Sequence, residues 1–270
     1  MAGSIAVERN AGGISGVLAL TLTHTGKFNA MSRSMWAELK AVFTAVQQDT
    51  DVRCVVLQGD QGHFCAGGDI AEYPAFRFDE AQLRHFHEQE VWGGLQAMLD
   101  CDVPIVARIE GNCMGAGMEI ASCCDLRLAA DNARFGAPIA RLGFPMAPRE
   151  AALVGQVAGA TVARAMLLAA EVFDAAAMLG HGFLTRVHTS EELPAQCVQL
   201  LSRMASLAPQ AARMNKRTLR GLNSCFAHAE YALGATDFVA SRFPDAYAYA
   251  PDAEHREGIA AFLDKRLPVF

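Results

Sequence analysis

The stretch PIVARIEGNCMGAGMEIASCCDLRLAADNARFGAPIARLG, residues 104–143, decides how the rest of the chain can fold. Its apolar beginning, residues 105–107, is typical of a buried strand. A glycine-rich loop at 111–117 follows, and the chain then enters a segment in which Glu119 stands among apolar residues. We expect a strand, a tight loop and a helix in this order, and residues 124–130 predict a further strand.

Glu119 is the residue of this stretch that most needs an explanation. Small residues at 115–117 let the backbone approach a ligand closely, and the start of a helix presents free N–H groups and a positive dipole. Glu119 follows Ala116 by about one helical turn, so its side chain can reach the same pocket. A buried carboxylate is costly, so we interpret Glu119 as functional; a helix-capping or solvated carboxylate is the alternative.

The first glycine loop along the chain lies in HFCAGGDIAEY, residues 63–73, and the loop at 111–117 is the second. It follows CVVLQGD, residues 54–60, which predicts a short buried strand. Ala66, Gly67 and Gly68 allow close approach of a ligand, and Asp69 can fix the turn by accepting local backbone N–H bonds. Because each loop follows a strand, we expect both loops to face one pocket.

The order of the elements predicts an α/β fold. Strands are expected near 14–23 as well as in the three places given above, and helices are expected between them, which indicates crossover connections. One helix begins at Ser32 or Ser34, a second covers 79–99, and from Arg149 onward the pattern is helical.

Composition excludes several classes of function. The net charge is −6 without a Lys/Arg run, so nucleic acid is not an expected partner. No apolar run approaches the roughly 20 residues that span a bilayer, and the first residues lack the pattern of a secretory signal, so we expect a cytoplasmic protein without a membrane partner. The eight cysteines form no C-x-x-C pair, and His85 and His87 cannot share a helix face, so we expect reduced thiols and no metal site.

Four segments together resemble the crotonase (enoyl-CoA hydratase/isomerase) superfamily: residues 63–73, 109–138, 176–187 and the tail EGIAAFLDKR at 257–266. The resemblance implies a crotonase-like α/β fold of repeated ββα units with a helical C-terminal region that mediates trimerisation. We divide the chain into a core at 1–195 and a helical region at 196–270, and expect a homotrimer or hexamer.

The resemblance also implies an acyl-CoA substrate and no cofactor beyond the coenzyme A of that substrate. The backbone N–H groups of Gly68 and Ala116 would hold the thioester oxygen, and Glu119 would transfer protons. A loop at 27–30 and basic residues near the C-terminus would bind CoA. The residues expected to bind substrate are Lys27, Phe28, Ala30, Ala66, Gly67, Asp69, Ile70, Gly115, Ile139 and Lys265.

One position departs from the pattern of the two-glutamate hydratases. Their second glutamate would stand at 139, where this chain has Ile139. A single glutamate can act as base and then return the proton as acid. Glu150 is a candidate replacement, although its place after Pro148 in a first helical turn also suits a charge–dipole role.

The leading hypothesis is therefore an enoyl-CoA hydratase or isomerase that stabilises a thioester enolate. Another crotonase-type reaction (isomerisation, hydrolysis or decarboxylation) and a non-catalytic acyl-CoA-binding homologue are the alternatives, because of Ile139. A dinucleotide site fits poorly, since its fingerprint needs glycine where Ile120 stands. No G-x-S-x-G nucleophile supports a serine hydrolase.

Overall fold

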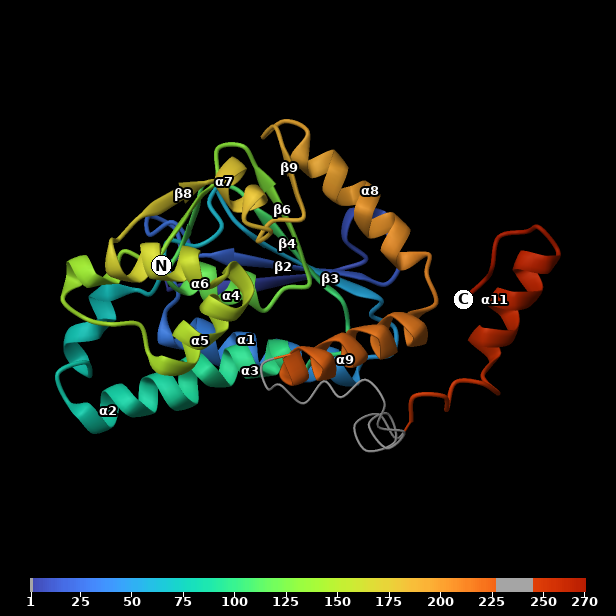
Figure 1. The fold of residues 1–270 in the computed structure, drawn as a ribbon, viewed down its shortest axis with the longest axis horizontal. Coiled ribbons are helices and arrows are strands. Elements are labelled where there is room, and N and C mark those ends of the chain that lie inside the picture. Colours follow the sequence, from blue (N-terminus) through green and yellow to red (C-terminus); the bar gives the residue numbers. More distant parts are fainter. Residues whose placement is uncertain (1, 227–244) are drawn as a thin grey trace.

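The computed structural model describes residues 2–226 and 245–270 (Figure 1). Its strands are β1 (Ser4–Arg9), β2 (Val17–Thr23), β3 (Cys54–Gly59), β4 (Ile105–Ile109), β5 (Asn112–Met114), β6 (Leu126–Ala130), β7 (Arg134–Gly136), β8 (Val172–Asp174) and β9 (Arg186–His188). Its α-helices are α1 (Arg33–Gln48), α2 (Glu80–His85), α3 (Trp92–Asp100), α4 (Ala116–Ser122), α5 (Pro148–Ala158), α6 (Ala160–Leu168), α7 (Ala175–Gly180), α8 (Leu193–Ala205), α9 (Pro209–Phe226) and α11 (Ala253–Leu263). Shorter helical turns are η1 (Ala11–Gly13), η2 (Ile70–Ala75), η3 (Phe86–Val91) and η4 (Ile139–Leu142).

A mixed sheet with the strand order β1-β2-β3-β4-β6-β9 forms the centre of the molecule. Only β1 runs antiparallel to its neighbour; the pairs from β2 to β9 are parallel. Parallel neighbours need crossover connections, which α1 and α3 supply. A small second sheet, β5-β7-β8, carries the second glycine loop at the end of β5. The α/β class expected from the sequence is confirmed.

The two faces of the central sheet are covered by different helices (Figure 1). Strand β2 alternates, so that Leu18 and Leu20 join the core with α1 and α3, whereas Val17 and Ala19 join the core with α8. The larger core continues to the helix that carries Glu119 and so fixes α4 against the sheet. The site is therefore attached to the most completely buried part of the molecule.

Local signals predicted the longer elements well. Ser32 is the N-cap of α1, where its hydroxyl accepts a hydrogen bond from the N–H of Met35 at 3.3 Å. The strand expected from residue 14 begins at Val17, because the preceding residues form a turn. The sequence did not predict β1, nor the three-residue strands β5, β7, β8 and β9, since three residues are too few to show a period.

The helix expected at 79–99 is divided. The wider π-helical turn η3 (Phe86–Val91) lies between α2 and α3, and it contains His87. Such turns interrupt the 3.6-residue period and are frequent at functional sites. The side chains that follow this turn therefore face directions that the helical spacing did not predict.

The C-terminal part of the chain contains two differently placed helices. Helix α8 (Leu193–Ala205) packs on the central sheet, so the expected boundary at 195/196 falls inside it. Helix α11 (Ala253–Leu263) lies apart from the core (Figure 1). Residues 227–244, which belong to the expected helical region, lie outside the described residues. No helix in the described ranges has the length and apolarity to cross a bilayer.

The cysteines that the structure describes are free, buried thiols, as expected from the sequence: Cys54, Cys65, Cys101, Cys113, Cys123, Cys124 and Cys197. Burial raises the pKa of Cys65 to about 12, so this thiol remains protonated. The side chain of Cys225, the remaining cysteine of the sequence, lies outside the described residues.

Candidate active site

The two glycine loops lie side by side, joined by backbone hydrogen bonds. The N–H of Cys65 donates to the carbonyl of Asn112 at 2.8 Å, and the N–H of Met114 donates to the carbonyl of Cys65 at 2.9 Å. A Cβ at Gly117 would come within 2.6 Å of that same Cys65 carbonyl oxygen, so glycine is required for this approach. The expectation that both loops face one pocket is confirmed.

Two backbone N–H groups, one from each loop, are free at this junction. Gly68 lies at the end of the first loop and Ala116 begins α4. Neither N–H donates a hydrogen bond to an acceptor within the described part of the chain. Gly115, which precedes α4, has φ +48°, a conformation that favours glycine and aims the start of the helix. Gly68 and Ala116 line the same cavity, so their N–H groups can bind one ligand.

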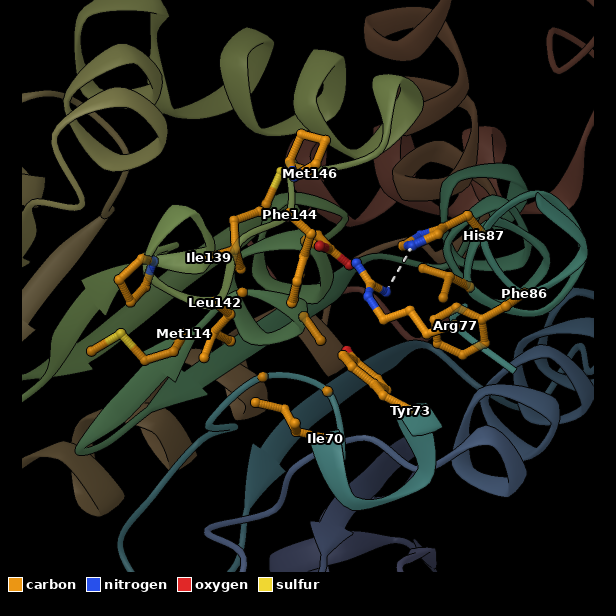
Figure 2. Close-up of a pocket in the computed structure, with 18 of the residues that line it drawn as sticks. Ile70, Tyr73, Arg77, Phe86, His87, Met114, Ile139, Leu142, Phe144 and Met146 are labelled. Carbon is orange, nitrogen blue, oxygen red and sulfur yellow. Dashed lines mark hydrogen bonds between the residues drawn. The ribbon is translucent and has the colours of Figure 1, made fainter. Parts of the chain in front are cut away.

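The cavity has a volume of about 290 Å³ (Figure 2). Its wall is mostly aromatic and aliphatic, with contributions from both loops, from η2, η3 and η4, and from the segment that leads to α5. Glu119 is the only carboxylate among the described residues that line it. The side chains labelled in Figure 2 converge from these elements on one space, which suits an acyl chain.

Glu119 lies in α4 and is buried. Burial raises the pKa of Glu119 from its usual 4.5 to about 8, and the charge of Glu150 adds to the increase. The carboxyl group is therefore mostly protonated near pH 7 and can exchange a proton within the physiological range. A carboxyl group poised in this way is suited to general acid and base chemistry.

Apart from Lys265, the residues expected to bind substrate separate into two groups. Those that line the cavity are Ala66, Gly67, Ile70, Gly115 and Ile139, together with Gly68, Ala116 and Glu119. Four others do not line the cavity: Lys27, Phe28, Ala30 and Asp69.

These four residues make contacts outside the cavity wall. Lys27 Nζ contacts Asp69 Oδ2 at 2.6 Å, and the other carboxylate oxygen of Asp69 accepts the N–H of Ala71 at 3.2 Å. The carbonyl of Phe28 accepts the N–H of Ala66 at 3.0 Å, while the carbonyl of Ala30 lies 2.7 Å from His24 Nδ1. Asp69 thus fixes its turn, as the sequence predicted.

Lys265 follows α11 and does not line the cavity of its own chain. The helix α11 that precedes it lies on the side of the molecule opposite α2 (Figure 1). A contact between Lys265 and a CoA phosphate stays a prediction.

Glu150 does not replace the missing carboxylate directly. It is buried in the first turn of α5, 2% exposed, and is not part of the cavity wall. Its Oε1 lies 3.1 Å from His87 Nδ1, whereas its Oε2 has no hydrogen-bond partner in the described structure. His87 itself lines the cavity. Glu150 therefore contacts a residue of the cavity wall, His87, but not the cavity itself.

Sequence reasoning missed four polar side chains of the wall: Tyr73, Arg77, His87 and Arg141. The histidine was expected to be satisfied or solvent-facing, and it is satisfied by Glu150 but faces the cavity. Tyr73 lies next to Gly68: a Cβ at position 68 would come within 2.2 Å of the tyrosine hydroxyl oxygen. The aromatic residues that follow the first glycine loop were the available signal, but no spacing connects residue 87 with residue 150.

The fold and the cavity define a protein of the crotonase class. The family model "Enoyl-CoA hydratase/isomerase" matches residues 12–270. The chain therefore belongs to the enoyl-CoA hydratase/isomerase family.

Relatives in other organisms support the assignment. The 2,3-dehydroadipyl-CoA hydratase of Escherichia coli K12 is 31% identical over 255 residues, which cover 94% of each chain. The crotonyl-CoA hydratase of Syntrophomonas wolfei is 30% identical over 240 residues, 88% of each chain. The crystal structure of an enoyl-CoA hydratase/carnithine racemase from Magnetospirillum magneticum aligns with a TM-score of 0.88 at 28% identity, covering 98% of this chain and 94% of that one.

Proposed function

We propose that this protein is an enoyl-CoA hydratase that stabilises a thioester enolate with the N–H groups of Gly68 and Ala116. The observation that carries the proposal is the meeting of two free N–H donors and one protonatable carboxyl group in a single cavity. Negative charge that builds on the thioester oxygen would be held by both donors. Removing one such donor from an acyl-transfer site typically costs about 3–4 kcal/mol of transition-state stabilisation.

Glu119 is proposed to carry the protons. In its ionised form it would take a proton from water as the oxygen attacks the double bond, and the protonated carboxyl group would then deliver that proton to the α-carbon. Positioned acid–base groups contribute about 10²- to 10⁴-fold to the rate. Since Ile139 presents an aliphatic side chain to the cavity, one carboxyl group would perform both transfers.

Double-bond isomerisation is the second candidate reaction, and Ile139 favours it. Moving a double bond requires the removal of a proton from one carbon and its return to another, which a single carboxyl group can perform without a positioned water. Hydrolysis and decarboxylation of a thioester would use the same oxyanion donors. The substrate profile distinguishes these reactions.

We further propose that α11 forms part of an interface between copies of this chain, in a trimer or hexamer. Large apolar side chains on and after this helix are exposed: Ile259, Phe262, Leu263, Leu267 and Val269. Apolar surface of this kind is typical of a protein–protein contact. Lys265, in the same segment, is proposed to meet a CoA phosphate, and the loop at 27–30 to flank the bound CoA.

The test is to incubate the protein with crotonyl-CoA and longer 2-enoyl-CoAs and follow the loss of the conjugated thioester absorbance. We expect turnover by the wild type and at least a 100-fold loss in Glu119→Gln, with CoA-thioester binding retained. Inactivity of the wild type toward the whole panel, with binding retained, would refute the hydratase assignment and support an acyl-CoA-binding homologue. Sedimentation or light scattering measures the oligomeric state, and a monomer would refute the interface.

A further inference from the structure

Arg77 places a positive charge in the acyl cavity without an acidic partner. Its side chain is half-buried and lines the same cavity as Glu119 (Figure 2). Within residues 2–226 and 245–270, no carboxylate forms an ion pair with its guanidinium. A partly desolvated cation with no counter-ion is costly, and burial accordingly lowers the pKa of Arg77.

The acids nearest to the site are already committed elsewhere. Asp69 is paired with Lys27 at 2.6 Å, and Glu150 accepts a hydrogen bond from His87 Nδ1 at 3.1 Å, so neither carboxylate contacts the guanidinium. Glu119 is mostly protonated near neutral pH, because burial raises its pKa to about 8. The charge of Arg77 is therefore available to an incoming anion.

Two aromatic rings contact the guanidinium of Arg77. The guanidinium carbon lies 3.6 Å from the ring centre of Phe144 and 4.7 Å from that of Tyr73. A cation–ring contact uses no N–H group of the guanidinium as a hydrogen-bond donor, so the remaining N–H groups can still bind an acceptor. Guanidinium N–H groups are the donors that bind a carboxylate with two parallel hydrogen bonds.

Two successive polar contacts, from Arg77 to His87 and from His87 to Glu150, orient the guanidinium. Arg77 Nη1 lies 3.5 Å from His87 Nε2, and His87 Nδ1 lies 3.1 Å from Glu150 Oε1 (Figure 2 draws the first contact). A guanidinium only donates, so Nε2 is the acceptor and the proton of the ring is on Nδ1, which donates to Glu150. Buried Glu150 thus fixes the tautomer of His87, and His87 fixes one edge of Arg77.

We propose that Arg77 binds a carboxylate carried by the acyl group, so that the preferred substrates are CoA thioesters of dicarboxylic acids. The inference rests on the proposed function, since it places an enoyl-CoA in this cavity. His87 and Glu150 act as positioning residues for Arg77. A second arginine of the wall, Arg141, is exposed and donates to the carbonyl of Ala170 at 3.2 Å, so it lacks this enclosed geometry.

The test uses pairs of 2-enoyl-CoAs of six and eight carbons whose far end is either a methyl group or a carboxylate. We expect the wild type to prefer the carboxylate member by at least tenfold in kcat/KM. Arg77→Met should lower kcat/KM for the carboxylate member about 10- to 100-fold, the range for hydrogen bonds to charged groups, and leave the methyl member unchanged or improved. Arg84→Met, which removes an exposed arginine of α2, is the matched control and should change neither.

The positioning role has a separate readout. His87→Gln should raise KM for the carboxylate member and leave kcat for both members nearly unchanged. A fall of kcat on both members would instead show that His87 transfers protons, and would overturn its assignment as a positioning residue.

The outcomes separate this inference from the proposed function. Turnover without a preference for the carboxylate member, or an equal loss on both members in Arg77→Met, would overturn the inference and leave the hydratase assignment intact; an equal loss would indicate a contact with CoA itself. If no thioester is turned over, calorimetric binding of the same pairs decides: a tenfold preference for the carboxylate member that Arg77→Met removes supports the inference, and equal affinities overturn it.

Discussion

Replacing Glu119 with glutamine is expected to make the protein more stable than the wild type at alkaline pH. The folded chain holds the Glu119 proton up to about pH 8, whereas the unfolded chain releases it near the usual pKa of 4.5. Below pH 4.5 both states are protonated and Glu119 makes no difference. Between these values the unfolded state binds fewer protons than the folded state, so stability falls as the pH rises.

The magnitude follows from the two pKa values. They differ by about 3.5, and each pKa unit corresponds to about 1.4 kcal/mol, so ionising Glu119 costs the folded state about 5 kcal/mol above pH 8. The cost grows by about 1.4 kcal/mol per pH unit between the two values. Glutamine has nearly the same shape and no charge, and it removes this dependence.

Urea unfolding at pH 5, 7 and 9 measures the effect. The difference in unfolding free energy between Glu119→Gln and wild type should increase with pH and level off above pH 8, since every other titrating group is common to both proteins. Glu80→Gln removes a carboxylate that is 86% exposed and should give a difference independent of pH. A difference for Glu119→Gln that does not change with pH would refute the inferred burial and its effect on the carboxyl group.

Further predictions concern the loops and the second acid. Gly117→Ala should lower kcat/KM at least tenfold, because its Cβ would come within 2.6 Å of the backbone of the first glycine loop, whereas Gly155→Ala, whose Cβ has only an ordinary 3.9 Å contact, should be neutral; equal effects would refute the steric argument. Glu150→Gln removes a charge that raises the pKa of Glu119, so the pH at which kcat/KM levels off should fall from about 8, and an unchanged profile would contradict this coupling. Ile139→Glu adds a carboxylate to the cavity wall and should raise kcat on crotonyl-CoA if one carboxyl group limits hydration; a measured decrease would show that it does not.

Much of the site could be predicted because its requirements are local. Gly115 has the positive φ that this turn requires, and Glu119 follows Ala116 by about one helical turn. The support from Asp69 to its own turn is likewise a contact between near neighbours. Segments with such short-range reasons are visible in the sequence before any tertiary contact is known.

The rest of the site could not be predicted, because it depends on long-range contacts. His87 and Glu150 are 63 residues apart in the chain and meet only when α5 packs near the π-helical turn η3. That turn changes the direction of its side chains, so the helical pattern of 79–99 did not indicate that His87 faces the cavity.

The sequence by itself determined the α/β class, the two glycine loops and the carboxyl group of Glu119, since each depends on the sterics and periodicity of neighbouring residues. Only the tertiary structure decided the polar wall of the cavity. It buries Glu150 behind His87, places Arg77 against two aromatic rings, and brings the aliphatic side chain of Ile139 into the cavity wall. The physical reason is that burial and charge pairing depend on what the folded chain brings together across the cavity, which no local pattern records.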